Sequence, residues 1–253
     1  MEEISGVLSA AFGRPGCNCM DMAFHRSYYL PAALAVCVLA LPLFGKEDAV
    51  SERLSNAATV FSEVMHTPDK AIPSDLVDRA ECVIIVPSLK SGGFIVGAKY
   101  GKGFILCRKR GGGWSAPGAI RIEGGSVGFQ IGAAETDVIM LVMNDEGKKA
   151  VLSSQYTMGG HAEVAAGPVG RSTSAQTSGW MTAGILSYSR SHGVFAGISL
   201  QGSTLREDLD DNQALYGKKL KNQEIVGTGS VRTPASARKL TAELSKYSPH
   251  ENK

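Results

Sequence analysis

Glycine content is the feature that most constrains how this chain can fold. The chain has 30 glycines among 253 residues, and most of them lie in the middle of the sequence. Glycine weakens helices but permits tight turns and close contact between backbones. The middle of the chain is therefore expected to form strands, and short apolar or alternating runs are found there at residues 82–86, 94–100, 104–110, 119–123, 127–131 and 138–143.

Two pairs of runs have the spacing of β-hairpins. Residues 94–100 and 104–110 flank Gly101-Lys102-Gly103. Residues 185–190 and 194–200 flank a turn at Ser191-His192-Gly193. Because glycine accepts the backbone angles of a tight turn, both short connections are predicted to reverse the chain.

Helical patterns come before and after these strands. An apolar stripe with helical spacing ends at Pro68, and a short helix is predicted over residues 74–80. The order helix, many short strands, helices predicts an α+β fold with a mainly antiparallel β-sheet, an N-terminal amphipathic helix and C-terminal helices. The stripe consists of Val50, Leu54, Ala57, Ala58, Phe61, Val64 and Met65.

The C-terminal part is predicted to contain two helices joined by a linker. Thr204 and Glu207 have the spacing of a capping box, and Gly217 lies where a C-terminal cap belongs. Residues 218–232 have the character of a linker. Thr233-Pro234 then starts the last helix, because proline is favoured at the first helical position.

The N-terminal segment has the pattern of an export signal. An uncharged apolar run covers residues 28–45, with His25 and Arg26 before it and a charged segment after it. We expect residues 1–45 to be a signal peptide, with residues 1–19 a misassigned start, and the protein to act in the periplasm or cell envelope. The alternative is an uncleaved membrane anchor, since a run of about 18 residues is near the lower limit for a span.

Two cysteines, Cys82 and Cys107, follow the predicted signal peptide, and both lie in predicted strands. In an oxidising compartment a disulfide between them would stabilise the fold by about 3 kcal/mol in the chain-entropy model. Buried free thiols are the alternative, because cysteine packs as a small apolar residue. Since the sequence does not place the two strands side by side, free thiols are slightly favoured.

Several kinds of chemistry are disfavoured by the motifs. The net charge of +2 gives no global support for nucleic-acid binding. The glycine-rich segments lack the spacing and the following helix of phosphate or dinucleotide loops, and the cysteines and histidines lack zinc-ligand spacing. His161 and Glu163 share a face if extended, which leaves a hydrolase as a weaker alternative. We therefore expect a protein that is not an enzyme and that binds no cofactor.

A basic segment is the best candidate for ligand contact. Its cations fall within residues 99–110 without an acidic residue, and a tryptophan follows. Cations at a loop tip attract anionic headgroups, and tryptophan is favoured at membrane interfaces. The alternative is a solvated hairpin end with the tryptophan packed in the core. The candidate lipid-binding residues are Lys99, Lys102, Arg108, Lys109, Arg110 and Trp114.

A long stretch of the chain resembles the SYLF family, also called the Ysc84 or lipid-binding SYLF domain. The similar segments are Gly159-Gly160, residues 165–171 (AAGPVGR), residues 188–202 (YSRSHGVFAGISLQG) and Tyr216-Gly217. The resemblance covers roughly residues 52–217 and is densest from Met158 onward. It suggests a SYLF domain over residues 46–217, followed by a linker and helix over 218–253.

The resemblance implies a domain that binds membrane phospholipids, with phosphoinositides as ligands of eukaryotic members. Some fungal members also bind actin filaments, usually next to an SH3 domain. This chain has an export signal and no room for an SH3 domain, and in both respects it resembles a bacterial exported member of the family. For such a protein we expect anionic phospholipid membranes as the partner, no nucleic acid, and no binding to actin. An envelope scaffold or protein-interaction module is the alternative.

Overall fold

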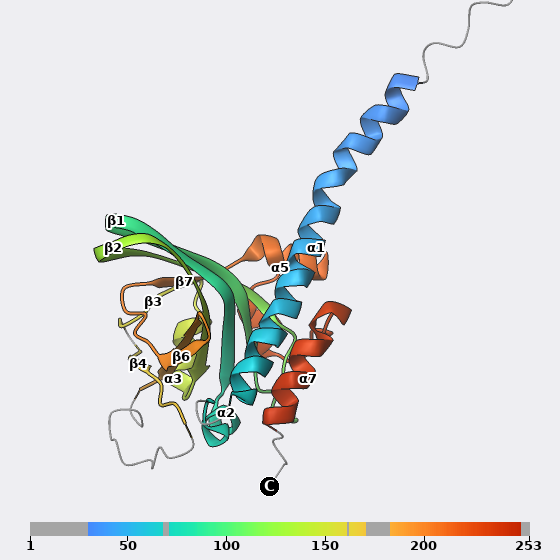
Figure 1. The fold of residues 1–253 in the computed structure, drawn as a ribbon. Coiled ribbons are helices and arrows are strands. Elements are labelled where there is room, and N and C mark those ends of the chain that lie inside the picture. The colour runs from blue at the N-terminus through green and yellow to red at the C-terminus, as the bar shows by residue number, and fades with distance from the viewer. Residues whose placement is uncertain (1–29, 68–70, 161, 171–182, 249–253) are drawn as a thin grey trace, which may run out of the picture. The chain divides into compact units, whose positions relative to one another are not determined.

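A computed structural model of the chain describes residues 30–67, 71–160, 162–170 and 183–248 (Figure 1). The chain divides into two units, residues 1–41 and 42–253, and the second carries the features below. Residues 1–29 of the predicted signal peptide lie outside the described residues. Within the described part of the chain, no helix is both long and apolar enough to cross a membrane.

The described residues contain a seven-stranded, mainly antiparallel β-sheet with helices, which confirms the predicted α+β class. The order is β3-β7-β2-β5-β4, with β1 paired to β2 and β6 paired to β5. Among the strands of the described residues, only β4 and β5 pair in parallel. The strands are β1 (Cys82–Cys107), β2 (Gly118–Val142), β3 (Gln155–Thr157), β4 (Val164–Ala166), β5 (Ile185–Ser191), β6 (Val194–Gly197) and β7 (Thr204–Glu207).

The second predicted hairpin is present. Strands β5 and β6 pair from Ser191 and Val194 outward, with His192 and Gly193 as the two turn residues. Both turn residues have positive φ, at 49° and 76°, as a two-residue hairpin turn of this hand requires.

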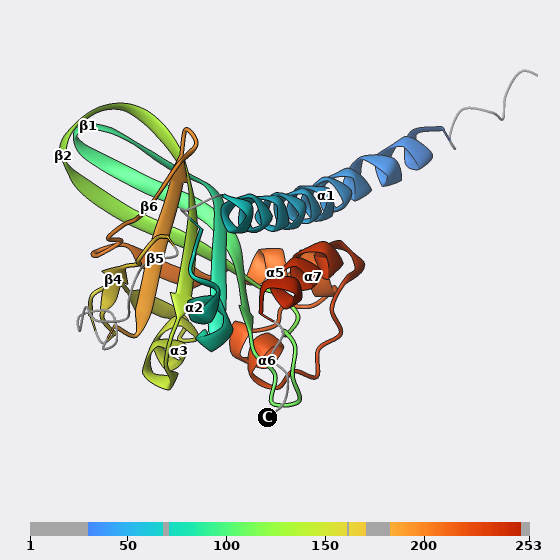
Figure 2. The same cartoon turned by 60° about the horizontal axis from the view of Figure 1, so that its bottom comes forward.

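The first predicted hairpin is wrong, because residues 94–110 do not reverse direction at Gly101-Lys102-Gly103. Residues 82–107 form one long strand, and β2 runs antiparallel to it from Cys82↔Val142 to Ile105↔Gly118 (Figure 2). Register shifts near Pro87 and Gly93 bend this ribbon. In the part of the chain that the structure describes, the middle of β2, between its contacts with β7 and β5, pairs only with β1.

The glycines of the expected turn instead let β1 bend back against its own first half. A Cβ atom at Gly103 would lie 2.1 Å from the Ile85 carbonyl oxygen and 2.7 Å from the Val86 Cα. At Gly101 it would lie 2.8 Å from a methyl group of Leu89. No side chain fits at such distances, so the close approach of backbones explains these glycines.

The bend of β1 brings its two ends together, and a disulfide joins them. Cys82 and Cys107 are bonded to each other and fully buried. The sequence-based preference for free thiols was therefore wrong. It failed because two residues of one strand, 25 positions apart, become neighbours only when that strand bends back.

Helices cover the strands on both faces. The first face packs against α1 (Leu30–His66), α2 (Ser74–Arg79) and α7 (Arg238–Tyr247), which lies beside α1 in both views (Figures 1 and 2). The second packs against α3 (Asp145–Val151) and α6 (Asn222–Gly227). Alternate residues of β1 serve the two cores, with Val83 and Ile85 facing one and Ile84 and Val86 the other.

Two predictions for the C-terminal part need correction. Thr204 and Glu207 form strand β7 rather than a capping box, and α5 (Leu209–Tyr216) is capped by the Asp208 carboxylate, which accepts from the Asp211 amide. The predicted linker over 218–232 contains α6. Gly217, with φ of 72°, ends α5 as expected.

Removing the disulfide should lower the free energy of unfolding. Replacing Cys82 and Cys107 by alanine frees the unfolded chain, and we expect a loss of about 3 kcal/mol. Urea unfolding of the oxidised protein and the double variant measures it. Fully reduced wild type should unfold at nearly the midpoint of the variant, whereas equal midpoints for all three would show that the bond adds no stability.

Glycine at position 103 should be indispensable for the bend of β1. Gly103→Ala forces a methyl group against the Ile85 carbonyl, so we expect a loss of about 1–3 kcal/mol or more in the free energy of unfolding. Gly111→Ala is the matched control, because a Cβ there meets nothing within 4 Å. An equal effect of the two changes would contradict the assignment.

Candidate functional site

The turn between β1 and β2 displays the exposed part of the predicted basic segment. Arg108 and Trp114 bridge the base of the turn, and the Lys109 amide donates to the Gly113 carbonyl oxygen at 3.0 Å. Gly112 and Gly113 both have positive φ, which glycine adopts at little cost. This local geometry leaves the side chains of Lys109 and Arg110 exposed to solvent.

A groove of about 580 Å³ lies beside this turn. Its walls are residues 108–112 of the turn, Lys148 of α3, and residues 226–229 at the end of α6. The lining contains four cations, Arg108, Lys109, Arg110 and Lys148, and no carboxylate. We call this feature the basic groove. It suits an anionic group, since several cations converge on it. The carboxylates that pair with two of them, Asp78 with Arg108 and Glu81 with Lys148, are not part of its lining.

Arg108 is largely committed to the fold. Its guanidinium donates to the carbonyl oxygens of Val77, Asp78 and Ala80 at 2.8–3.0 Å and contacts Ser248. Burial lowers the pKa of Arg108, and the nearby charges of Asp78 and Glu81, which act to raise that pKa, only partly offset the effect of burial. Arg108 therefore fixes the turn against α2 and has little capacity left for a ligand.

Trp114 is also structural rather than interfacial. Its side chain is buried, at 5% exposure, and belongs to the core beneath α1 and α7. The Arg108 guanidinium lies 4.5 Å from its ring centroid, a cation–π contact. The packed alternative for the tryptophan is thus the arrangement found.

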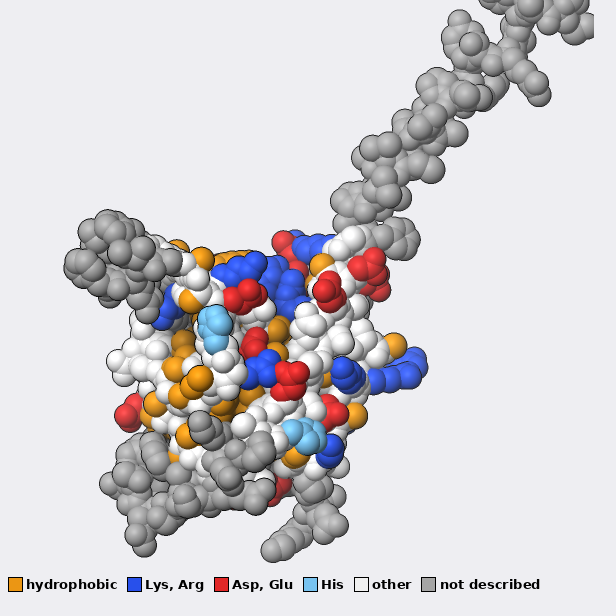
Figure 3. Space-filling model, viewed as in Figure 1, with side chains coloured by type: hydrophobic (Ala, Val, Ile, Leu, Met, Phe, Trp, Pro, Cys, Tyr) orange, Lys and Arg blue, Asp and Glu red, His pale blue; other side chains and the backbone are white. Residues whose placement is uncertain are grey.

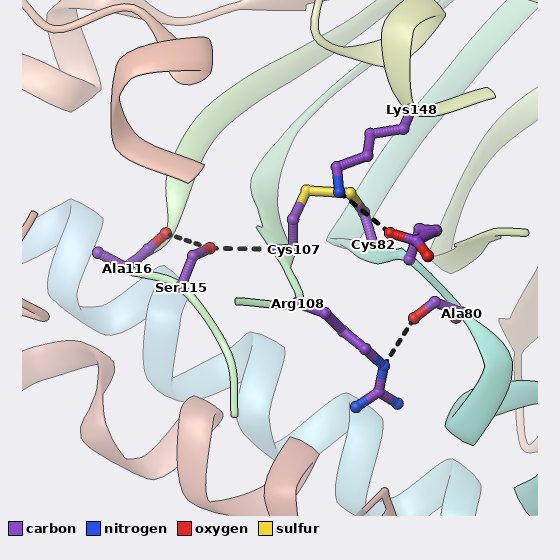
Figure 4. Close-up of a disulfide and its surroundings, with 8 residues drawn as sticks. Ala80, Cys82, Cys107, Arg108, Ser115, Ala116 and Lys148 are labelled. Carbon is purple, nitrogen blue, oxygen red and sulfur yellow. Dashed lines mark hydrogen bonds and ion pairs between the residues drawn. A yellow bond between two sulfur atoms is a disulfide. The ribbon is translucent and has the colours of Figure 1, made fainter. Parts of the chain in front are cut away.

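Lys148 joins the groove from a distant part of the chain. Its ammonium contacts the Glu81 carboxylate at 3.0 Å. The Glu81 carbonyl oxygen accepts from the Arg108 amide at 2.9 Å. Figure 4 shows Lys148 next to the Cys82–Cys107 disulfide. Glu81 therefore links α3 and the turn, which are two walls of the basic groove.

The other two predicted residues lie in β1, away from the turn. Lys99 is half-buried opposite Gly124 of β2. Lys102 contacts two nearly buried carboxylates, Asp208 at 2.7 Å and Asp211 at 3.0 Å. On the face drawn in Figure 3, Lys and Arg side chains lie beside Asp and Glu side chains, as expected where cations form ion pairs within the fold.

These contacts shift the titration of the buried pair. Burial alone would raise the pKa of Asp208, but hydrogen bonds from Lys102 and from the Asp211 amide outweigh it, and the pKa lies below the ordinary 3.8. Burial alone would lower the pKa of Lys102, but its hydrogen bonds to Asp208 and Asp211 outweigh burial, and the pKa of Lys102 lies above the ordinary 10.5. Arg53 of α1 adds a 2.7 Å contact to Asp211. The cluster holds α1, β1 and α5 together.

The predicted site is therefore divided. Lys109 and Arg110 remain available to a ligand, while Arg108, Lys102 and Trp114 serve the fold. Sequence reasoning missed Lys148 and residues 226–229, because these meet the turn only in the folded chain. Gly227-Thr228-Gly229 was the one local signal, since a glycine-rich segment allows close approach of a ligand.

Two other kinds of site were considered, a hydrolase pair and a metal site. His161 lies outside them, and Glu163 is exposed, so the pair suggested for a hydrolase is not tested. Among the described side chains, no group of three His, Cys, Asp or Glu residues could hold a metal ion.

Comparison with known proteins identifies the domain. Residues 123–247 match the family model described as Ysc84, Las17-binding protein actin regulator. The SH3 domain-containing YSC84-like protein 1 of Rattus norvegicus is 36% identical over 181 residues, covering 71% of this chain and 53% of the relative. The Homo sapiens protein of that name is 34% identical over 181 residues, covering 71% and 52%.

A fungal relative is similar at the same level. LAS seventeen-binding protein 3 of Saccharomyces cerevisiae is 35% identical over 169 residues, covering 66% of this chain and 36% of the relative. The chain thus spans about half the length of the animal relatives and about a third of the fungal one.

The expectation that actin is not a partner was wrong. The matched family is described as an actin regulator, and the fungal relative is named for binding LAS seventeen. That expectation was based on the N-terminal run and on chain length. The similarity instead includes the folded domain itself, whose surface does not depend on a leader segment.

Acid should weaken the Lys102–Asp208 contact in a defined range of pH. Because the folded-state pKa of Asp208 lies below 3.8, its ionised form contributes stability above that value, and the contribution is lost as pH falls through the lower folded value. The difference in unfolding free energy between wild type and Asp208→Asn should be constant from pH 7 to about pH 5 and shrink towards pH 2. Urea unfolding at each pH measures it, and a constant difference down to pH 2 would contradict the assignment.

Proposed function

Because this chain contains a domain of the Ysc84 (SYLF) family, we propose that it is a non-enzymatic module that binds anionic phospholipid headgroups at the basic groove. One observation carries the proposal: two exposed cations, Lys109 and Arg110, lie on a groove whose lining, among the described residues, contains no carboxylate. A headgroup phosphate is compact and anionic, and main-chain amides of glycine-rich segments can approach it closely. The groove offers such segments at Gly111 and at residues 227–229, whereas the Gly112 amide already donates to the Lys109 carbonyl oxygen.

The binding energy comes mainly from the two exposed cations. Lys109 and Arg110 project from the turn, and each contributes about 1 kcal/mol near an anionic membrane surface. Lys148 keeps a partner in Glu81, so its contribution is smaller. Such weak, salt-sensitive contacts suit a peripheral domain that attaches reversibly.

The proposed place of action is the cell envelope after export. Two observations support it, the apolar run at residues 28–45 and the Cys82–Cys107 disulfide. Disulfides form and persist in oxidising compartments and are rare in reducing ones.

A protein partner is the second candidate function. The family description and the name of the fungal relative favour it, since both refer to Las17 or actin. The relatives are longer than this chain, so their whole activities do not transfer directly. A partner with an acidic surface would use the same exposed cations.

The turn variant, Lys109→Glu with Arg110→Glu, should no longer bind vesicles. At about 1 kcal/mol for each cation near an anionic surface, losing Lys109 and Arg110 weakens partitioning by about 30-fold, and reversal to glutamate adds repulsion. Flotation with phosphatidylcholine vesicles containing graded phosphatidylglycerol, at low and high salt, measures the effect. The matched control is Lys218→Glu with Arg238→Glu, exposed residues with the same charge change that do not line the groove.

The outcomes separate the two candidate functions. Binding that ignores lipid charge and salt, or equal loss in both double variants, would refute headgroup binding at this groove. Co-sedimentation with actin filaments in the same buffers tests the second candidate. Filament binding that is lost in the turn variant, without vesicle binding by wild type, would assign the groove to a protein partner.

A further inference from the structure

The disulfide joins two residues that are next in sequence to residues holding the walls of the basic groove. Cys107 immediately precedes Arg108, Lys109 and Arg110, which form one wall. Cys82 immediately follows Glu81, whose carboxylate holds Lys148 of the opposite wall. Figure 4 shows the disulfide between Lys148 on one side and Arg108 on the other. A single covalent bond therefore connects the segment that carries Arg108, Lys109 and Arg110 to the segment whose Glu81 side chain holds Lys148.

Weaker contacts reinforce this junction. The Arg108 amide donates to the Glu81 carbonyl oxygen at 2.9 Å, one residue away from the disulfide on each strand end. The Cys107 amide donates to Ser115 Oγ at 3.0 Å, and the Ser115 amide donates to the Cys107 carbonyl oxygen at 2.8 Å. These bonds close the base of the turn, so its position depends on where Cys107 is held.

We infer that the anion affinity of the basic groove depends on the redox state of Cys82–Cys107, and that the groove is complete only in the oxidised protein. The inference rests on the proposed function of the same groove. A thiolate of a dithiol reductant attacks one sulfur, and the S–S bond breaks. The second thiol of the reductant then resolves the mixed disulfide. The protein gains two electrons and two protons as Cys82 and Cys107 thiols, and the reductant leaves as a cyclic disulfide.

Reduction removes the covalent bond that ties the start of the turn to residue 82. Both cysteines are fully buried, so two separate thiols must be accommodated in an interior of the close packing typical of proteins. Residues 82 and 107 are then free to move apart, which weakens the Glu81–Arg108 hydrogen bond next to them. The turn then shifts relative to Lys148, and the cations no longer converge on one anion.

If anion binding requires the disulfide, the compartment decides where the protein binds its ligand. A reducing compartment would leave the groove incomplete during synthesis, and an oxidising one would complete it. Anion binding would therefore begin only after the chain reaches the compartment proposed for its action. The disulfide would link folding, location and ligand binding through one bond.

Vesicle partitioning of the oxidised and reduced forms tests the inference. The probe is phosphatidylcholine vesicles with 30 mol% phosphatidylglycerol, roughly the charge density of an anionic surface. Samples are the oxidised protein, the protein reduced by dithiothreitol with both thiols counted by a chromogenic reagent, and Cys82→Ser/Cys107→Ser. We expect partitioning to fall by about tenfold or more in both disulfide-free forms, with unchanged far-ultraviolet circular dichroism.

Two controls separate the groove from general stability. Leu54→Ala removes a fully buried side chain of α1 that does not line the groove. It destabilises the fold but should bind vesicles normally below its unfolding temperature. Cys82→Ala/Cys107→Val fills the space of the disulfide with apolar groups, and it replaces the serine variant if that one does not fold. Hydrogen exchange of residues 108–112 should be faster in the disulfide-free forms than in Leu54→Ala.

The possible outcomes are distinct. Equal partitioning of oxidised and disulfide-free protein, with free thiols confirmed, would overturn the redox dependence and leave headgroup binding intact. A matching loss in Leu54→Ala would also overturn it, because the effect would then reflect stability alone. Oxidised protein that does not bind the vesicles would refute the proposed function, and the dependence with it.

Discussion

The bend of β1 back against itself is the constraint on which the rest of the structure depends. Ile85 and Val86 contact the backbone at Gly101 and Gly103 so closely that no Cβ atom fits between them. Strand β2 follows β1 through the whole bend, and β5 and β7 then pair with opposite ends of β2. The disulfide at the two ends of β1 completes the closure and places the turn at residues 108–114 next to α2 and α3.

Buried polar contacts carry this constraint to the remaining wall of the groove. Asn212 of α5 accepts from the Ala119 amide at 2.7 Å, and Asn222 at the start of α6 donates to the Ala119 carbonyl oxygen at 2.9 Å. The two asparagines also bond to each other at 2.8 Å. Because these groups are buried, each unmade bond would cost about 1–3 kcal/mol. They therefore fix α6, and with it residues 226–229, against the start of β2.

Some basic side chains of this protein stabilise the fold and others are exposed to a ligand, and the sequence alone does not tell the two groups apart. Lys102 and Arg53 neutralise the nearly buried carboxylates of Asp208 and Asp211, and Arg108 satisfies carbonyl groups at the end of α2. Of the four cations that line the basic groove, Lys109 and Arg110 have no ion-pair partner among the described residues, whereas Arg108 and Lys148 do. Residues 158–202, whose motifs resemble the family, include β4, β5 and β6, whereas the basic groove is built from other parts of the chain. The family match itself begins at residue 123, after the turn.

Local patterns in the sequence determined the parts of the fold that depend on near neighbours. The apolar stripe from Val50 to Val64 predicted the buried face of α1, and the turn at His192-Gly193 predicted a hairpin, because both follow from spacing within one element. The family could be predicted from its motifs. Tertiary structure alone decided that Gly101 and Gly103 mark a close approach and not a turn, that Cys82 meets Cys107, and that Lys148 joins Lys109 and Arg110. These contacts depend on the path of a bent 26-residue strand, and no periodicity along the chain encodes where such a strand returns to itself.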